Sequence, residues 1–282
     1  MRVIDAEAVA ALGWPAAIAA IRAAAASDSG TTGPPRTVVD VRAGQLAFDA
    51  GGRRPVRRGK GGLDCSRQPG ARSPRVQGAY LLFDAATLRI AAVLDGVALT
   101  TLRTAAVSAL AVDLLAQPGE ARLVVFGCGP QARAHIEALP HVRPIRCLTI
   151  VGRTAGQAEA LVQRCAAHGL RRVGRRSGRH CRRGHRGVRD RPRGRRYSSR
   201  RHFRPMPWSL PSGRTSRDAR EVDSALVDRA TVVVESRVAA LREAGDIVLA
   251  IADGVPSERA IDGDLAELVG GHLTVSADRP RL

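Results

Sequence analysis

The spacing of hydrophobic residues switches several times along the chain between a helical period and a strand period. Apolar positions at helical spacing predict helices over 7–27, 98–116, 132–139 and 155–168. Short β-branched or alternating runs predict strands over 37–41, 44–48, 79–83, 90–94, 122–126, 145–151, 230–234 and 246–251. Strands and helices alternate from residue 122 onward, which predicts an α/β fold around a parallel sheet. Pro118-Gly119 interrupts the pattern and marks a candidate domain boundary.

Two segments, 53–75 and 171–214, follow neither period, and we call them the basic windows. Residues 53–75 hold eight basic residues and one acid, and residues 171–204 hold sixteen arginines and one acid. These stretches sum to +22, whereas the whole chain carries +19, so all other residues sum to −3. The charge is therefore local. An arginine-rich nucleic-acid arm is one interpretation of such windows, with Tyr197, Phe203 and Trp208 available to stack on bases.

Cysteine usage and the absence of long apolar runs limit the class of protein. Five cysteines, at 65, 128, 147, 165 and 181, are odd in number and fit no zinc spacing. His180, Cys181 and His185 lie among arginines that would repel a cation, so we predict no metal site. No run of about 18 apolar residues indicates a membrane span, and the N-terminus lacks the form of a signal peptide. We therefore expect a reduced, cytoplasmic protein without a membrane partner.

The most informative local motif is Gly127-Cys128-Gly129-Pro130-Gln131-Ala132, which follows a predicted strand and begins a predicted helix. The first glycine permits a tight turn, the second admits a pyrophosphate close to the backbone, and Ala132 packs on the sheet. The helix N-terminus favours the anion. This context predicts a dinucleotide site; the alternative is a plain strand-to-helix turn.

Two arginines are candidates for binding other parts of the ligands. The second strand of this unit ends at Gly152-Arg153-Thr154 without an acidic residue for the ribose of NAD, so Arg153 and Thr154 favour the 2′-phosphate of NADP. Arg103 begins an otherwise apolar helix, where a cation adds to the positive end of the helix and suits a carboxylate or phosphate. Both arginines have the alternative interpretation of solvated surface residues.

Seven short stretches occur in a fixed order outside the basic windows. They are Pro35-Arg36-Thr37, Pro74-Arg75-Val76-Gln77-Gly78, 99–106, 127–135, Asp218-Ala219-Arg220-Glu221-Val222-Asp223, Val233-Val234-Glu235-Ser236 and Glu243-Ala244-Gly245-Asp246. Together they resemble the ornithine cyclodeaminase/mu-crystallin family. No single motif is specific, but the combination is.

The resemblance implies a Rossmann-type, doubly wound parallel sheet with a second, discontinuous α+β domain. It assigns 1–117 to the substrate and dimerisation domain, 118–275 to the NAD(P)-binding domain, and 276–282 to a truncated return to the substrate domain. It implies a homodimer that uses NAD or NADP on a small amino or imino acid. By position, Arg36 and Arg103 would bind the substrate carboxylate and Thr104 would lie beside the cofactor. Its pyrophosphate would be held by Gly127, Gly129, Gln131 and Ala132.

The resemblance fails inside the basic windows, and a shifted reading frame restores it. Read from the second base of the Val56 codon, degenerate codons allow Gly-Val-Lys and then Asn-Pro-Ala-Arg-Gly-Leu, which the family has before Pro74. Read from the third base of the Arg201 codon, they allow the family's strand and turn before Asp218. We hypothesise paired, compensating frameshifts. The family's active-site lysine would be encoded across Lys60 and Gly61, so the catalytic residues stay unassigned.

The family leaves the reaction open. One possibility is the conversion of ornithine to proline and ammonia, in which hydride leaves the α-carbon and later returns to a cyclic imine. The alternatives are a ketimine or pyrroline-2-carboxylate reductase and a non-catalytic NADP(H)-binding protein; nucleic acid is not the expected partner. We expect the chain as written to be poorly soluble and weakly active, because arginines replace family strands and the family's closing helix is missing.

Overall fold

The computed structural model describes residues 1–27, 37–41, 44–53, 56–64, 76–84, 86–152, 155–167, 173–177, 217–276 and 278–282. The chain forms two compact units. Unit 1 contains Met1–Ala17 and Ser29–Arg103, and unit 2 contains Ile18–Asp28 and Thr104–Leu282. The division falls inside helix α3 (Gly96–Leu115), whereas the sequence marked Pro118-Gly119. The domain bounds given by the resemblance stay predictions.

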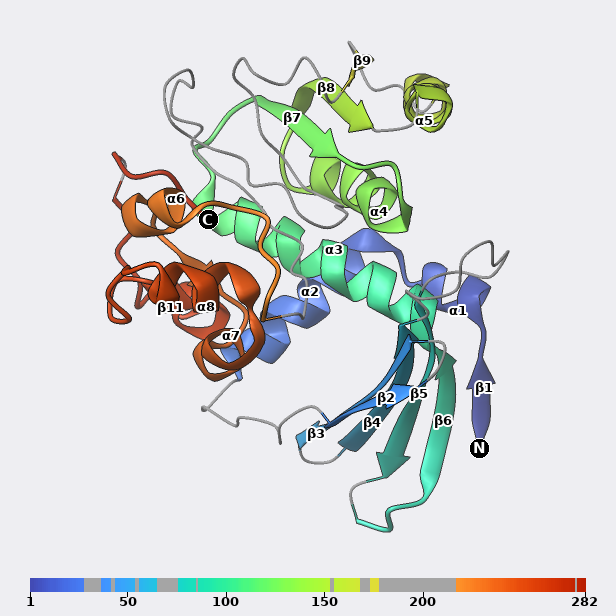
Figure 1. The fold of residues 1–282 in the computed structure, drawn as a ribbon. Coiled ribbons are helices and arrows are strands. Elements are labelled where there is room, and N and C mark those ends of the chain that lie inside the picture. The colour runs from blue at the N-terminus through green and yellow to red at the C-terminus, as the bar shows by residue number, and fades with distance from the viewer. Residues whose placement is uncertain are drawn as a thin grey trace. The chain divides into compact units, whose positions relative to one another are not determined.

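Unit 1 is built on a six-stranded sheet (Figure 1). Its strands are β1 (Arg2–Ile4), β2 (Thr37–Val41), β3 (Gly44–Arg53), β4 (Val56–Asp64), β5 (Val76–Asp84) and β6 (Ile90–Asp95). They lie in the order β1-β6-β5-β4-β3-β2. β1 runs parallel to β6, and the other neighbours are antiparallel. β4 lies inside the first basic window, so a segment without sequence periodicity forms an interior strand.

Tight backbone packing fixes the start of α3 against β5. A Cβ atom on Gly96 would lie 2.6 Å from the carbonyl oxygen of Gly78, so only glycine fits at this contact. The Asp95 carboxylate accepts a hydrogen bond from the Ala98 amide at 2.7 Å and satisfies one of the free donors of the first turn. The predicted helix 98–116 is thereby confirmed with a start two residues earlier.

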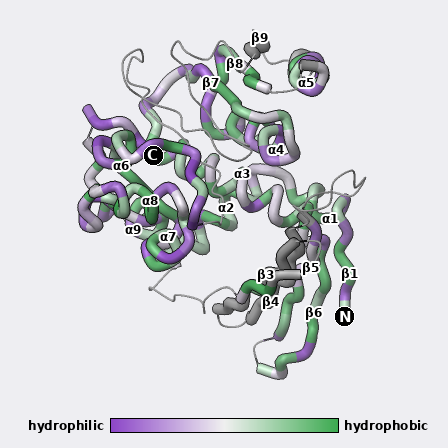
Figure 2. The backbone as a smooth tube through the Cα atoms, in the orientation of Figure 1, coloured by the Kyte–Doolittle hydropathy of each residue, from purple (hydrophilic) through white to green (hydrophobic). Residues whose placement is uncertain are grey.

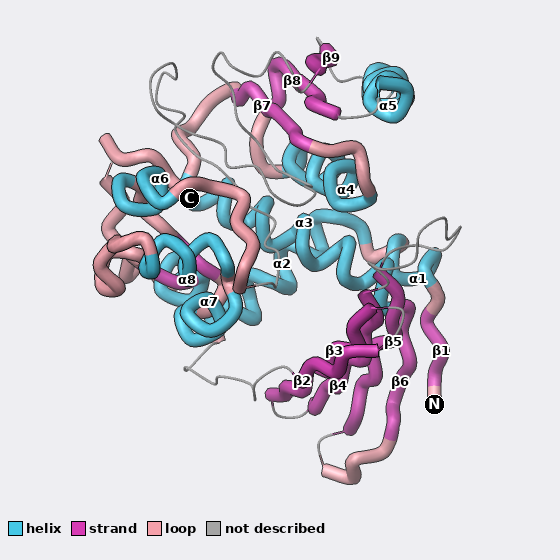
Figure 3. Tube along the Cα trace, in the orientation of Figure 1, coloured by secondary structure: helices cyan, strands magenta, loops and turns pink. Residues whose placement is uncertain are grey.

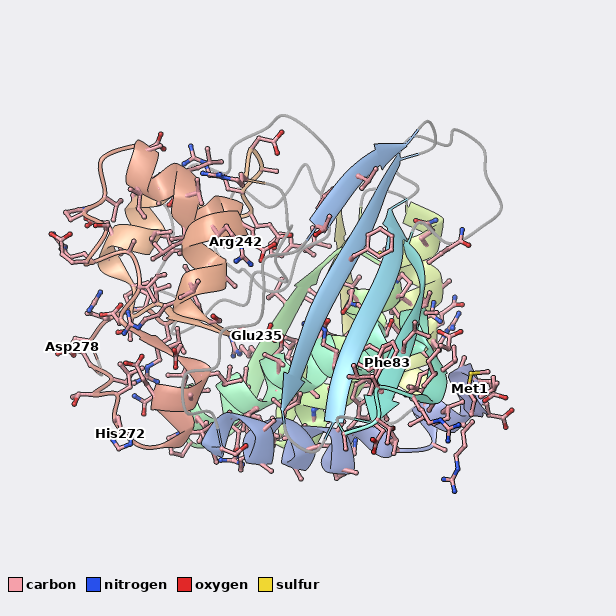
Figure 4. The ribbon with its side chains drawn as sticks, turned by 90° about the horizontal axis from the view of Figure 1, so that it is seen from below. Met1, Phe83, Glu235, Arg242, His272 and Asp278 are labelled. Carbon is pink, nitrogen blue, oxygen red and sulfur yellow. The ribbon has the colours of Figure 1, made fainter. Side chains whose placement is uncertain are left out.

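One face of the six-stranded sheet carries apolar side chains that are exposed or half-buried. Strand register places Val3, Val39, Phe48, Phe83 and Val93 on this face. Val3, Val39 and Phe48 are 77%, 47% and 46% exposed. Figure 2 shows hydrophobic colour along β5 and β6, and Figure 4 labels Phe83 beside the strands. We call these five residues the apolar sheet face.

The first part of unit 2 is a parallel α/β sheet. Strands β7 (Ala121–Phe126), β8 (Ile145–Gly152) and β9 (Val173–Ser177) lie in the order β7-β8-β9. Helix α4 (Pro130–Ala138) with the short 3₁₀ helix η1 (Leu139–His141) connects the first two strands, and α5 (Ala155–Ala167) follows β8. This arrangement is one half of a doubly wound sheet. β9 lies in the second basic window.

The C-terminal part of unit 2 is mostly helical. Its elements are α6 (Ser224–Arg229), β10 (Val233–Val234), α7 (Arg237–Glu243), α8 (Gly245–Ala252), β11 (Gly263–Asp264) and α9 (Leu265–Val269). β10 pairs in parallel with β11. The residues expected to return to the substrate domain also pack here, since the Thr231 amide donates to Pro280 O and the Leu282 amide donates to Thr231 O. Leu282 joins the apolar core of this part.

Three predicted elements need correction. The predicted strand 246–251 is wrong, because this run is the helix α8, cyan in Figure 3. A short run of apolar residues has no polar positions to reveal its period. The predicted strand 230–234 is reduced to Val233–Val234 and an isolated bridge at Thr231. The predicted helix 7–27 is two helices, α1 (Ala6–Ala10) and α2 (Gly13–Ala26), separated where Gly13 takes a φ of +70°.

Two arginines close the C-terminal end of α3. The last carbonyls of a helix have no partner inside the helix, and a cation there also complements the helix dipole. Arg143 Nη2 donates to the carbonyls of Asp113 and Ala116, the residue after the helix, and to Val112 O, which also accepts from the Ala116 amide; these contacts are 3.2–3.4 Å. Arg281 Nη1 donates to Leu115 O. The end of the helix is therefore satisfied by side chains distant in sequence.

By length and composition alone, α3 meets the requirement for a membrane-crossing helix, which the sequence expectation had not anticipated. The helix carries Arg103 and Asp113 among its apolar residues. Ala105, Ala106 and Leu110 have no exposed surface. A core helix of a soluble protein passes the same test, so this feature is weak evidence for a span.

Candidate functional site

The glycine motif lies at the edge where β7 and β8 end together. Phe126 and Val151 are register partners in the parallel ladder. The amide of Gly127 donates to Val151 O at 2.9 Å and ties the start of the loop to the neighbouring strand. In open α/β sheets, ligands bind outside the carboxyl ends of the strands. The loop therefore occupies the position at which this architecture binds ligands.

The two glycines have distinct backbone roles. Gly127 has a φ of +108°, a conformation that L side chains rarely adopt, so the turn requires glycine. Gly129 is extended (φ −79°, ψ −177°) and is the N-cap of α4 without a side chain to cap it. Pro130 fits the first helical position because its missing amide is not needed there. The helix N-terminus thus keeps free donors and a positive dipole end for an anion.

The residues that follow the glycines fit a bound dinucleotide. Ala132 is 2% exposed, so a small residue is packed beneath the first turn, as the motif predicts. Gln131 Oε1 is buried and has no hydrogen-bond partner among the residues described. Because the two ends of an amide exchange by rotation, this side chain can offer an acceptor or an N–H donor to a ligand. The loop, the uncapped helix and the unpaired amide are compatible with a pyrophosphate group.

A buried histidine connects this helix to α3. His135 has no exposed surface. Its Nδ1 lies 2.7 Å from Gln131 O, and its Nε2 lies 2.9 Å from the hydroxyl of Ser108 on α3. Burial lowers the pKa of His135 below its usual value, so the ring is neutral at pH 7. A carbonyl only accepts, so Nδ1 carries the proton, and Nε2 accepts from the Ser108 hydroxyl.

The predicted ligand-binding residues differ in how far the structure describes them. Thr104 is partly exposed on α3, one helical turn before Ser108. Arg103 is also partly exposed on this helix. Arg36, Arg153 and Thr154 lie outside the described residues. The roles of all five stay predictions, although Gly152, which precedes Arg153, ends β8 at the same edge as the glycine loop.

The sequence analysis did not find the Ser108–His135 contact. The two residues are 27 positions apart on different helices, so no local period connects them. The available signal was the half-buried Ser108, which lies on α3 between the buried Ala105 and Ala109, since a polar group packed against apolar residues needs a partner. His135 lies four residues after Gln131, which is the spacing of neighbours on one helix face.

Other polar groups of the described chain have structural roles or lie away from the loop. A cavity of about 470 Å³ is lined by Asp228, Arg229, Glu258, Arg259, Asp262 and Arg279, none of which belongs to the glycine motif. Arg279 pairs with Asp262 at 2.8 Å. Within the described ranges, no group of three or more His, Cys, Asp or Glu side chains is arranged to hold a metal ion. His180, Cys181 and His185 lie outside those ranges.

Comparison with known proteins identifies relatives. Residues 65–175 match the ornithine cyclodeaminase/mu-crystallin family. The chain is 32% identical over 209 residues to the ketimine reductase mu-crystallin of Mus musculus. This match covers 70% of this chain and 60% of that protein. It is 31% identical over 211 residues to the Delta(1)-pyrroline-2-carboxylate reductase of Paracoccus denitrificans (strain Pd 1222), covering 70% of this chain and 63% of that protein. The chain thus spans less than two thirds of the length of either relative.

A solved structure shares the fold. The Delta(1)-pyrroline-2-carboxylate reductase of Thermococcus litoralis, in complex with NADH and L-proline, superposes with a TM-score of 0.80 at 22% identity. The match covers all of this chain and 90% of that chain. The predicted α/β fold class is therefore confirmed. The motifs, the fold and these matches agree in relating the chain to the ornithine cyclodeaminase/mu-crystallin family, whose model matches residues 65–175.

Proposed function

We propose that the protein binds NAD(P)(H) and catalyses oxidoreduction of a small α-imino or α-amino acid. The observation that carries this proposal is the geometry of the glycine loop. Gly127 at positive φ and the uncapped N-terminus of α4 lie together where β7 and β8 end. Two reductases of cyclic or open imines are relatives at 31–32% identity, which favours reduction of pyrroline-2-carboxylate as the first reaction to test.

In this proposal, the predicted cofactor-binding residues contact different parts of the dinucleotide. The loop amides near Gly127 and Gly129 and the first turn of α4 hold the pyrophosphate, and Gln131 donates or accepts beside it. Thr104 approaches the cofactor from α3. The cofactor, when bound, supplies or accepts hydride. Arg153 and Thr154 favour NADP over NAD because a guanidinium and a hydroxyl suit the 2′-phosphate.

Substrate binding is assigned to arginines. Arg36 and Arg103 would hold the carboxylate that amino and imino acids share, because the planar fork of a guanidinium matches a carboxylate in a bidentate contact. This contact suits pyrroline-2-carboxylate and ornithine equally, so it does not select between reductase and cyclodeaminase.

The second candidate reaction is the cyclodeamination of ornithine, which the family's description favours. Two assays separate the candidates. A reductase consumes NADPH or NADH with pyrroline-2-carboxylate, read as loss of absorbance at 340 nm. A cyclodeaminase releases ammonia and proline from ornithine with catalytic cofactor. Binding of NADPH without either turnover would leave a dinucleotide-binding role, and failure to bind NADPH and NADH would refute the proposal.

We also propose that the protein is a homodimer formed through the apolar sheet face. Exposed apolar side chains gathered on one face of a folded unit are typical of an interaction site. Val3, Val39 and Phe48 are each at least 46% exposed, so a charge there is tolerated by the monomer. Sedimentation should give a dimer for the wild type and a monomer for Phe48→Lys. A monomeric wild type, or a Phe48→Lys dimer of undiminished affinity, would contradict this assignment.

The frameshift hypothesis remains our proposal for the basic windows. β4 is an interior strand of the sheet, yet its sequence Val-Arg-Arg-Gly-Lys-Gly-Gly-Leu-Asp has three glycines and three cations. Glycine and lysine are depleted in strands, so the backbone role and the residue types disagree. Sequencing the coding DNA decides the matter. A gene whose alternative frames do not encode the family segments across both windows excludes the hypothesis.

A further inference from the structure

We propose that Ser108 and His135 form a positioning pair that holds the first turn of α4 at a fixed distance from α3 for dinucleotide binding. The inference rests on the proposed function, because it concerns the same cofactor site. Neither residue belongs to the glycine motif's pyrophosphate contacts, and both lie within unit 2. The pair acts through Gln131 on one helix and Thr104 on the other.

The direction of each hydrogen bond follows from chemistry. The Gln131 carbonyl can only accept, so His135 donates to it from Nδ1 over 2.7 Å. His135 Nε2 then has only a lone pair, and the Ser108 hydroxyl donates to it over 2.9 Å. A residue at 108 must therefore carry a hydroxyl. Threonine preserves the donor, whereas alanine leaves a buried ring nitrogen without its partner.

The pair connects two elements that both border the predicted ligand. Gln131 belongs to the first turn of α4, two residues after the N-cap Gly129. Ser108 lies four residues after Thr104, so both are on one face of α3. A bond between these helices fixes the gap between the pyrophosphate end of the site and the threonine. If the distance between the two helices is already fixed before the ligand binds, less conformational entropy is lost on binding.

Local surroundings make the connection rigid. His135 is fully buried, and Ala105, Ala109 and Ala132 around the two helices are 2% exposed or less. Protein interiors are close-packed, so a fully buried imidazole has little room to adopt another rotamer. Because buried polar groups need partners, the ring has a strong preference for its hydrogen bond with the Ser108 hydroxyl. Removing that hydroxyl should loosen α4 against α3 without unfolding either helix.

The test compares Ser108→Ala and Ser108→Thr with the wild type by titrating NADPH and NADH and following reduced-nicotinamide fluorescence. Ser108→Ala should raise both dissociation constants about tenfold, and Ser108→Thr should stay within about twofold. Ser224→Ala is the matched control. It removes a serine of unit 2 that bonds Arg220 and Asp253 at 2.7 Å, so it costs stability without touching the loop.

Three results would overturn the inference. They are an unchanged affinity in Ser108→Ala, an equal loss of affinity in Ser224→Ala, and failure of Ser108→Thr to restore binding. A double-variant cycle adds a further check. If Ser108 acts through His135, then Ser108→Ala should weaken binding no further in a His135→Phe background, and additive losses would contradict the pair. A wild type that binds no dinucleotide refutes the proposed function instead, so the two failures are distinguishable.

Discussion

Replacing Gly127 by alanine should separate the backbone requirement of the glycine loop from its role in binding. Gly127 has a φ of +108°, and Gly119, in the turn before β7, has the same φ of +108°. A Cβ atom on Gly119 would meet nothing within 4 Å. An L residue at positive φ is strained by about 1–3 kcal/mol, offset by about 0.4–1 kcal/mol because alanine restricts the unfolded chain. Each variant should therefore lose about 1–2 kcal/mol of unfolding free energy.

The binding of NADPH should distinguish the two variants. At Gly127 the strain of the added methyl group falls on the turn that shapes the pyrophosphate loop, so the dissociation constant of NADPH should rise at least about tenfold. At Gly119 the dissociation constant should stay unchanged. Urea unfolding measures the free energy of unfolding, and fluorescence titration measures the dissociation constant of NADPH. Equal dissociation constants in the two variants would refute the placement of the pyrophosphate at this loop.

Three further substitutions probe the described contacts. Arg143→Met removes a guanidinium from three carbonyls at 3.2–3.4 Å and should lower the unfolding free energy by about 1–3 kcal/mol in urea; no change would mean water caps α3 equally well. Asp246 accepts two buried backbone amides at 2.6 and 2.8 Å, so Asp246→Ala should lose about 2–5 kcal/mol and Asp246→Asn clearly less, and equal losses would exclude this role. Burial lowers the pKa of His135 in the folded state, so its contribution to stability is complete above about pH 6.5 and is lost as pH falls below that value. The stability of His135→Gln should vary less between pH 7.5 and pH 5, and parallel pH curves for both proteins would contradict the assignment.

The fold was predictable where apolar residues repeat or alternate over several turns or strands. The strands of residues 37–41 and 90–94 and the helix of 155–168 were placed within one or two residues of β2, β6 and α5. α8 was missed because all its residues from Ile247 to Ala252 are apolar, so the sequence shows no polar face even though only Ile247 and Ala250 of these are buried. β4 and β9 were missed because their strand positions carry arginine and glycine.

The candidate site was predictable only in its local part. The spacing of Gly127, Gly129 and Ala132 identified the loop, since each position has a backbone or packing reason that sequence preserves. The Ser108–His135 hydrogen bond depends on how α3 and α4 pack, and the sequence of one helix does not reveal where the other helix lies. A contact of this kind can be identified only from the three-dimensional structure, which shows the partner that a buried polar group requires.

The double closure of the α3 C-terminus has a consequence for the time course of synthesis. The bond from Arg281 to Leu115 spans 166 residues, whereas Arg143 reaches the same helix end after 27–31 residues. A ribosome adds roughly 5–20 residues per second, so the second arginine follows the helix by roughly 8–33 s. During that interval Arg143 is the one of these two arginines that can bind the final carbonyls. A nascent chain lacking Arg143 would expose a frayed helix end to chaperones and proteases for most of its translation.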